Sequence, residues 1–148
     1  LNRAPYIRLC SGVYAFPQGH PRSESRSDLI DAKSFWMYAQ EADGSMMVYP
    51  RMVIVNPESA AHLLVSVKDR IERGVDSVVA GYKVLSHKVA SGEVDKRELR
   101  EEQLRLERKF ALVKKLAGFY EKWLGLDFSN IVTRPYAHIR RTRSLNTG

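Results

Sequence analysis

Apolar residues recur with helical spacing over two long stretches of the chain. The first stretch opens at residues 56–58 (Asn-Pro-Glu), where Asn can cap free amides, Pro suits the first helical position and Glu lies at the positive end of the helix dipole. Apolar positions then continue at steps of three or four to Val89, and Gly92 is a typical C-terminal stop. Gly74 weakens the pattern, so the sequence allows either one long helix or two shorter ones.

The second stretch carries the clearest local signal. Asp95 occupies an N-cap position and Glu98 follows three residues later, which is an Asp-type capping box. From residue 99 to residue 124 a seam of apolar positions steps alternately by four and three, with one polar interruption at Gln103. The pattern predicts a helix over residues 96–124 that ends at Gly125. Because the connection over residues 91–95 is short, the two stretches should form an antiparallel αα-hairpin.

The region before these helices is expected to be irregular at first and then β-structured. Residues 1–33 contain frequent Pro and Gly together with aromatic residues, which predicts an extended arm lying on this domain or on a partner. Residues 34–40 are rich in aromatics, residues 46–55 are β-branched and apolar, and Asp43-Gly44 between them is a turn dipeptide. This pattern predicts a β-hairpin over residues 34–55, with Pro50 at an edge or a bulge.

These elements predict an α+β fold. It consists of an N-terminal extended arm (1–33), a domain of β-hairpin plus long antiparallel αα-hairpin (34–126) and a basic C-terminal extension (127–148). The length of 148 residues allows one domain of ordinary size.

Composition narrows the function classes. Lys and Arg number 24 against 17 Asp and Glu, a formal net charge of +7. The single cysteine, Cys10, excludes an internal disulfide framework and a cysteine-built zinc site. No apolar run approaches the roughly 20 residues that a membrane-spanning helix needs.

No catalytic pattern is visible. The four histidines share no helix turn and form no metal-binding motif, and no glycine pattern matches a phosphate-binding loop or a dinucleotide fold. The sequence therefore predicts no enzyme, no metal and no cofactor. A small regulatory enzyme would require the histidines or Cys10 to gather in one pocket.

The C-terminal extension is the most basic region per residue, and its arginines alternate with aromatic side chains. Arginine pairs with phosphates, while Tyr136 and His138 can stack on bases, so the segment favours RNA, although an anionic membrane or an acidic protein groove would suit the same residues. We expect it to be unstructured until bound. The predicted RNA contacts are Arg3, Arg8, Arg134, Tyr136, His138, Arg140, Arg141 and Arg143.

A second apolar stripe lies beside the seam in the C-terminal half of the predicted helix 96–124. It comprises Leu112, Leu116, Phe119 and Trp123. A two-helix hairpin alone cannot bury two stripes. The second stripe is therefore either covered by the N-terminal elements or is an interface with a partner.

Extended ends on a modest core are typical of a subunit within a larger assembly, since loops without their own core need a neighbour to order them. We therefore expect a non-catalytic structural subunit of a large ribonucleoprotein, such as a mitochondrial ribosome, with protein subunits and RNA as partners. The alternative is an accessory subunit of a mitochondrial membrane-associated complex, an ATP synthase or a respiratory complex, acting through the helical hairpin. The mitochondrial expectation rests on residues 1–16, which hold Arg3 and Arg8 and no acid, as expected after a cleaved organellar presequence. A shortened chain would equally explain the start at Leu1.

Overall fold

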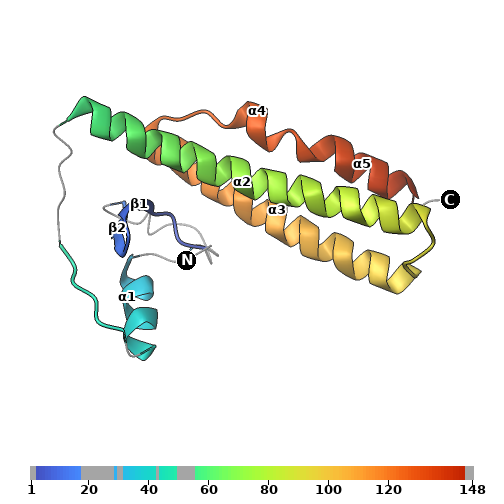
Figure 1. The fold of residues 1–148 in the computed structure, drawn as a ribbon, viewed down its shortest axis with the longest axis horizontal. Coiled ribbons are helices and arrows are strands. Elements are labelled where there is room, and N and C mark those ends of the chain that lie inside the picture. Colours follow the sequence, from blue (N-terminus) through green and yellow to red (C-terminus); the bar gives the residue numbers. More distant parts are fainter. Residues whose placement is uncertain (1–2, 18–28, 30–31, 43, 50–55, 146–148) are drawn as a thin grey trace.

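Two long antiparallel helices form the framework of the molecule. The computed structural model describes residues 3–17, 29, 32–42, 44–49 and 56–145. Helix α2 (Pro57–Ala90) and helix α3 (Lys96–Leu124) run side by side along most of the length of the molecule (Figure 1). The C-terminal helices α4 (Ser129–Val132) and α5 (Pro135–Leu145) lie along one side of this pair. The strands β1 (Ile7–Cys10) and β2 (Val13–Ala15) and helix α1 (Ala32–Glu41) lie on the other side.

The ends of both long helices are capped as the sequence predicts. The Asn56 side chain accepts a hydrogen bond from the backbone N–H of Glu58 (2.8 Å), and the Asp95 side chain accepts one from the N–H of Glu98 (2.7 Å). Gly125 ends α3 in the left-handed conformation, with φ of 66°, which favours glycine. The predicted antiparallel αα-hairpin is therefore confirmed, including the bounds of the helix over residues 96–124.

The question left open at Gly74 is settled in favour of one continuous helix. Both Gly74 and Gly81 lie on the side of α2 that faces α3. A β-carbon at position 74 would lie 3.0 Å from the Val113 side chain, and one at position 81 would overlap the Leu106 side chain. Glycines seven residues apart thus allow the two helix backbones to approach closely, which compensates for their low helix propensity.

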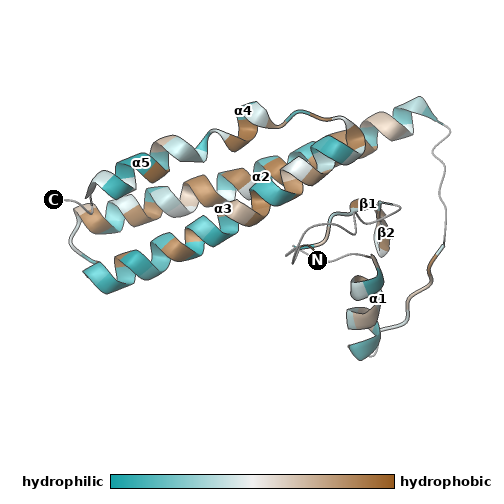
Figure 2. Cartoon of the chain, turned by 180° about the vertical axis from the view of Figure 1, so that it is seen from behind, coloured by the Kyte–Doolittle hydropathy of each residue, from teal (hydrophilic) through white to brown (hydrophobic). Residues whose placement is uncertain are grey.

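Two hydrophobic clusters follow each other along the helix pair, and Figure 2 shows the alternating hydrophobic and hydrophilic bands on α2 and α3. Each cluster is named here after one of its members, Ile7 or Ile139. The buried members of the Ile7 cluster are Ile7, Val67, Ile71, Val75, Val113, Leu116, Ala117, Tyr120, Phe128 and Ile131. The buried members of the Ile139 cluster are Val78, Tyr82, Leu85, Leu99, Leu106, Phe110 and Ile139. The N-terminal strand therefore contributes to the Ile7 cluster alone, whereas the C-terminal extension contributes to both clusters, through Phe128 and Ile131 in the first and Ile139 in the second.

An arginine fastens the N-terminal segment to the helix pair. The guanidinium of Arg70 donates to the backbone oxygens of Ala4 (3.0 Å) and Tyr6 (3.2 Å) and to the Tyr120 hydroxyl oxygen (2.6 Å). It also lies 4.0 Å from the centroid of the Tyr6 ring, a cation–π distance. The Tyr120 hydroxyl donates to the Tyr6 oxygen (2.6 Å). Burial raises the pKa of Tyr120, and the positive charge of Arg70 opposes that rise.

The α+β class with a hairpin before the helical hairpin is confirmed, but the hairpin lies elsewhere than predicted. β1 and β2 pair antiparallel within residues 7–15, inside the segment expected to be irregular. Residues 34–40, predicted as a strand, belong to helix α1. From this helix Phe35 packs on Tyr14 and Phe16, with ring centroids 6.2 and 5.4 Å away, and aromatic residues occur in helices as well as in strands. Residues 44–49 form no regular element, and residues 50–55 of the predicted second strand lie outside the described part of the chain.

The C-terminal extension is also more ordered than expected, because it forms α4 and α5 against α2. Ile131, Pro135, Ile139 and Thr142 are buried there. One apolar residue per turn, helped by small and polar neighbours, is enough to hold α5, and so sparse a pattern is hard to recognise in a sequence. Across the residues that the structure describes, no helix has the length and apolarity needed to cross a membrane.

Candidate nucleic-acid interface

Helix α5 presents a basic surface on an ordered backbone. The helix contains three arginines and no acidic residue. Ile139 and Thr142 point inward, whereas Arg140, Arg141 and Arg143 are exposed. Positions three and four apart share a helix face, so burial at 139 and 142 places the arginines on the remaining, outward part of the helix.

Two buried contacts hold α5 in place. Ile139 is 8% exposed and belongs to the Ile139 cluster. Thr142 is fully buried, and its hydroxyl oxygen lies 3.2 Å from that of Ser86 on α2 and donates to the backbone oxygen of His138 (2.9 Å). The arginines are therefore displayed by a backbone that does not have to be ordered by a partner, which lowers the entropic cost of binding.

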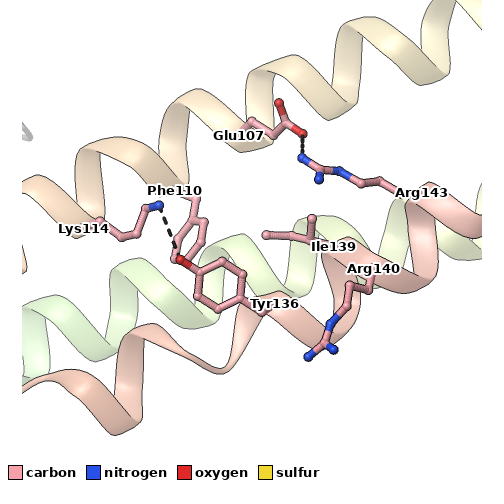
Figure 3. A pocket seen from close by; sticks show the side chains of 7 residues that line it. All are labelled: Glu107, Phe110, Lys114, Tyr136, Ile139, Arg140 and Arg143. Atoms are coloured by element: carbon pink, nitrogen blue, oxygen red, sulfur yellow. Dashed lines mark hydrogen bonds and ion pairs between the residues drawn. The ribbon is translucent and has the colours of Figure 1, made fainter.

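A cavity of about 390 Å³ lies between α3 and α5, next to this basic surface (Figure 3). It is lined by Glu107, Phe110, Lys114, Tyr136, Ile139, Arg140 and Arg143. Phe110 is buried, and Tyr136 meets it edge to face, with ring centroids 5.4 Å apart and an interplanar angle of 77°. The Lys114 ammonium lies 4.9 Å from the centroid of the Phe110 ring. The cavity thus combines an aromatic wall with a cationic rim.

Charges around the cavity are partly balanced. Arg143 donates to the Glu107 carboxylate at 3.0 Å, whereas Arg140 makes no ion pair with any residue that the structure describes. The lining holds three cationic side chains and one carboxylate, so it is net positive. Burial raises the pKa of Tyr82 on α2, the Glu107 charge raises it further and the Arg143 charge lowers it.

Two polar groups are buried without a partner in this half of the core. The Tyr82 hydroxyl and the Gln103 side-chain nitrogen form no hydrogen bond with the described residues. Both lie where α2 and α3 pack together, and Gln103 is the polar interruption in the apolar seam of α3. An unsatisfied buried polar group costs stability, so these positions weaken the α2–α3 contact.

The structure brings together only part of the predicted RNA-binding set. Tyr136, Arg140 and Arg143 gather around the cavity, and the exposed Arg141 lies on the same helix. Arg134 instead lies 3.8 Å from each of two carboxylates on α2, those of Glu72 and Asp76. His138 is half-buried, which leaves less of its ring open to stacking than the sequence suggested.

The two N-terminal arginines are separate from this group. Arg3 and Arg8 are both exposed, and the Arg8 side chain donates to the backbone oxygen of Cys10 (3.4 Å). Strand β1 contacts α2 and contributes Ile7 to the Ile7 cluster, whereas α5 closes the Ile139 cluster. These arginines therefore belong to a different part of the surface.

The predicted partner interface is largely covered from within the chain. Leu116 is a buried member of the Ile7 cluster, and Leu112 and Trp123 are half-buried against that cluster. Phe119 is half-buried beside Tyr120 and Trp123. The N-terminal strand supplies part of this cover through Ile7 and Leu9.

Sequence reasoning missed the contribution of α3 to the site. Glu107, Phe110 and Lys114 are not among the residues that the sequence predicts to contact RNA. The signal was their spacing, because positions 107, 110 and 114 differ by three and four and therefore share one helix face. That this face lies opposite α5 depends on how α5 packs.

The remaining candidate residues do not assemble into a metal site. Cys10, His62 and His87 are exposed. Among the described residues, no three His, Cys, Asp or Glu side chains are grouped so that they could hold a metal ion.

Comparison with known proteins yields no relative from which a role could be transferred. No family model matches the chain, and neither the curated proteins nor the solved structures contain a match.

Proposed function

We propose that the protein is a non-catalytic structural subunit of a large ribonucleoprotein assembly, for example a mitochondrial ribosome, and that it contacts RNA through α5. The observation that carries the proposal is the exposure of Arg140, Arg141 and Arg143 on one ordered helix beside an exposed tyrosine. Guanidinium groups pair with phosphates, and their binding releases counterions from the nucleic acid. The exposed Arg3 and Arg8 supply a second, smaller contact with RNA at the other end of the framework.

The test measures the affinity of the full chain for RNA as a function of salt. Binding should weaken steeply with salt, and a variant with Arg140, Arg141 and Arg143 changed to alanine should bind at least tenfold more weakly. Its slope of log affinity against log salt should also fall by about 2, since each lost contact with single-stranded RNA removes about 0.7.

A matched control exists on α3. Changing Lys96, Arg97 and Arg100 to alanine removes the same charge from exposed positions away from the cavity. This control should lose little affinity. Absent binding, salt-insensitive binding, or equal losses in both triple variants would overturn the proposal.

A different surface favours the alternative role, in which the chain is an accessory subunit of a mitochondrial membrane-associated complex. Large apolar side chains are exposed on α1 and on the segment that follows it: Met37, Tyr38, Met47, Val48 and Tyr49. Such a surface suits docking onto a protein neighbour. Gentle purification with and without nuclease separates the two roles, because nuclease releases an RNA-bound subunit and leaves a protein-docked one in its complex.

A further inference from the structure

The cavity between α3 and α5 has a feature that phosphate contacts alone do not explain. Tyr136 is 41% exposed, although its ring is fixed on one side by Phe110 and its hydroxyl oxygen lies 3.5 Å from the Lys114 nitrogen. A ring that is both held and accessible is a stacking surface that loses little freedom when a planar ligand binds.

Two cationic side chains flank this ring. Arg140 follows Tyr136 by one helical turn, lines the same cavity and has no ion-pair partner among the described residues. Lys114 approaches from α3, with its nitrogen 5.8 Å from the centroid of the Tyr136 ring. Arg143 is held by Glu107, which leaves Arg140 and Lys114 for an anion, and Figure 3 shows these two side chains on opposite sides of the Tyr136 ring.

We propose that this cavity binds one unpaired nucleotide, with its base stacked on Tyr136 and the phosphates that flank the base paired with Arg140 on one side and Lys114 on the other. This assignment rests on the proposed function, which makes single-stranded RNA the source of the nucleotide. A free nucleotide has the same chemistry. An acidic peptide could pair with the cations but has no planar group for the tyrosine ring. A duplex keeps its bases stacked on one another, so the site selects single-stranded over double-stranded RNA.

The experiment uses the full chain and a single-stranded oligoribonucleotide that contains the fluorescent adenine analogue 2-aminopurine, compared with the same sequence as a duplex. Stacking on Tyr136 should quench the fluorescence of the single strand. Tyr136→Ala should weaken binding of the single strand about tenfold, because one base–aromatic stack carries an effect of that order. It should leave duplex binding unchanged.

Matched variants separate the ring from its hydroxyl and from the fold. Tyr136→Phe keeps the ring and should bind the single strand within about twofold of the original chain. Tyr38→Ala removes another exposed tyrosine, on α1, and should have no effect. Because Tyr136 is exposed, its variants should fold, and thermal unfolding followed by circular dichroism verifies this.

The outcomes distinguish this inference from the proposed function. If no RNA binds, the proposed function fails as well. If RNA binds but Tyr136→Ala binds single strand and duplex as before, the cavity assignment alone is overturned, and the same holds if an acidic peptide competes fully with the single strand. Competition by adenosine monophosphate identifies a free nucleotide as an occupant of the site. If the monophosphate does not compete and binding of the single strand still depends on Tyr136, the nucleotide in the site comes from RNA.

Discussion

The two ends of the chain close the two halves of one helix pair in different ways. The N-terminal segment is held by Arg70, whose guanidinium is shared among two backbone oxygens, a tyrosine hydroxyl and a tyrosine ring. The C-terminal helix is held mainly by Ile139 and Thr142 and keeps its own arginines at the surface. One end therefore uses an arginine to complete the core, and the other displays arginines outward.

This difference separates anchoring from binding. A guanidinium surrounded by acceptors has its hydrogen-bonding capacity used within the fold, so Arg70 stabilises rather than recognises. Arg140 on α5, which makes no ion pair with a described residue, keeps that capacity for a ligand. In the Ile139 half the buried Tyr82 hydroxyl and Gln103 nitrogen form no hydrogen bond with a described residue, whereas the Tyr120 hydroxyl of the Ile7 half both accepts and donates one. The Ile7 half should accordingly be the more rigid of the two.

The strongest test of this comparison is Arg70→Met. The methionine keeps part of the apolar stem but removes the donors, which leaves the Ala4 oxygen without its bond, so the free energy of unfolding should fall by about 3 kcal/mol. Urea denaturation measures the loss. Hydrogen exchange should show increased opening of residues 4–15 and unchanged protection of α5.

The control for this variant is Arg73→Met. Arg73 is exposed and, among the described residues, donates only to the backbone oxygen of Asp69 on its own helix, so the change should be nearly neutral. Equal losses in both variants, or opening of α5 in Arg70→Met, would contradict the anchoring role.

A smaller effect of opposite sign is expected in the Ile139 half. Gln103→Leu removes a buried nitrogen that is unpartnered among the described residues and completes the apolar seam of α3, so it should raise the free energy of unfolding by about 1 kcal/mol. Tyr82→Phe removes the other unpartnered group and should act in the same direction. If thermal unfolding shows that both variants are destabilised, these polar groups have hydrogen-bond partners. The two halves of the helix pair then do not differ in this respect.

The smallest expected effect is a change of stability at alkaline pH. It compares Tyr82 in the Ile139 half with Tyr120 in the Ile7 half. The pKa values of Tyr82 and Tyr120 both lie above the ordinary value of 10.0, mainly because of burial. The folded chain therefore holds protons that the unfolded chain releases above pH 10, so stability is unaffected well below that pH and falls as the pH rises beyond it.

Chemical denaturation between about pH 8 and pH 11 measures this loss. Tyr82→Phe and Tyr120→Phe should each reduce it, whereas Tyr38→Phe, at an exposed position on α1, should leave it unchanged. A loss of stability that is the same in all three variants would show that the buried tyrosines do not cause it.

Sequence reasoning succeeded for features that depend on residues close together in the chain. The caps at Asn56 and Asp95, the stop at Gly125 and the apolar seam of α3 depend on neighbours within a few residues, and these contacts hold in any context. The aromatic segment 34–40 misled because aromatic residues occur in strands and helices alike. Its conformation is coupled to contacts of Phe35 with residues about twenty positions earlier in the chain.

The candidate site divides in the same way. The residue types on α5 and their basic character were visible in the sequence, as was the antiparallel pairing of the two long helices. Only the tertiary structure decided that α5 is folded, that Lys114 and Phe110 face it, and that Arg134 turns to α2 while Arg140 makes no ion pair within the described part of the chain. The physical reason is range: helix periodicity and capping act within one or two turns, whereas a cavity requires side chains more than twenty residues apart to meet, and packing of the whole chain sets which of them do.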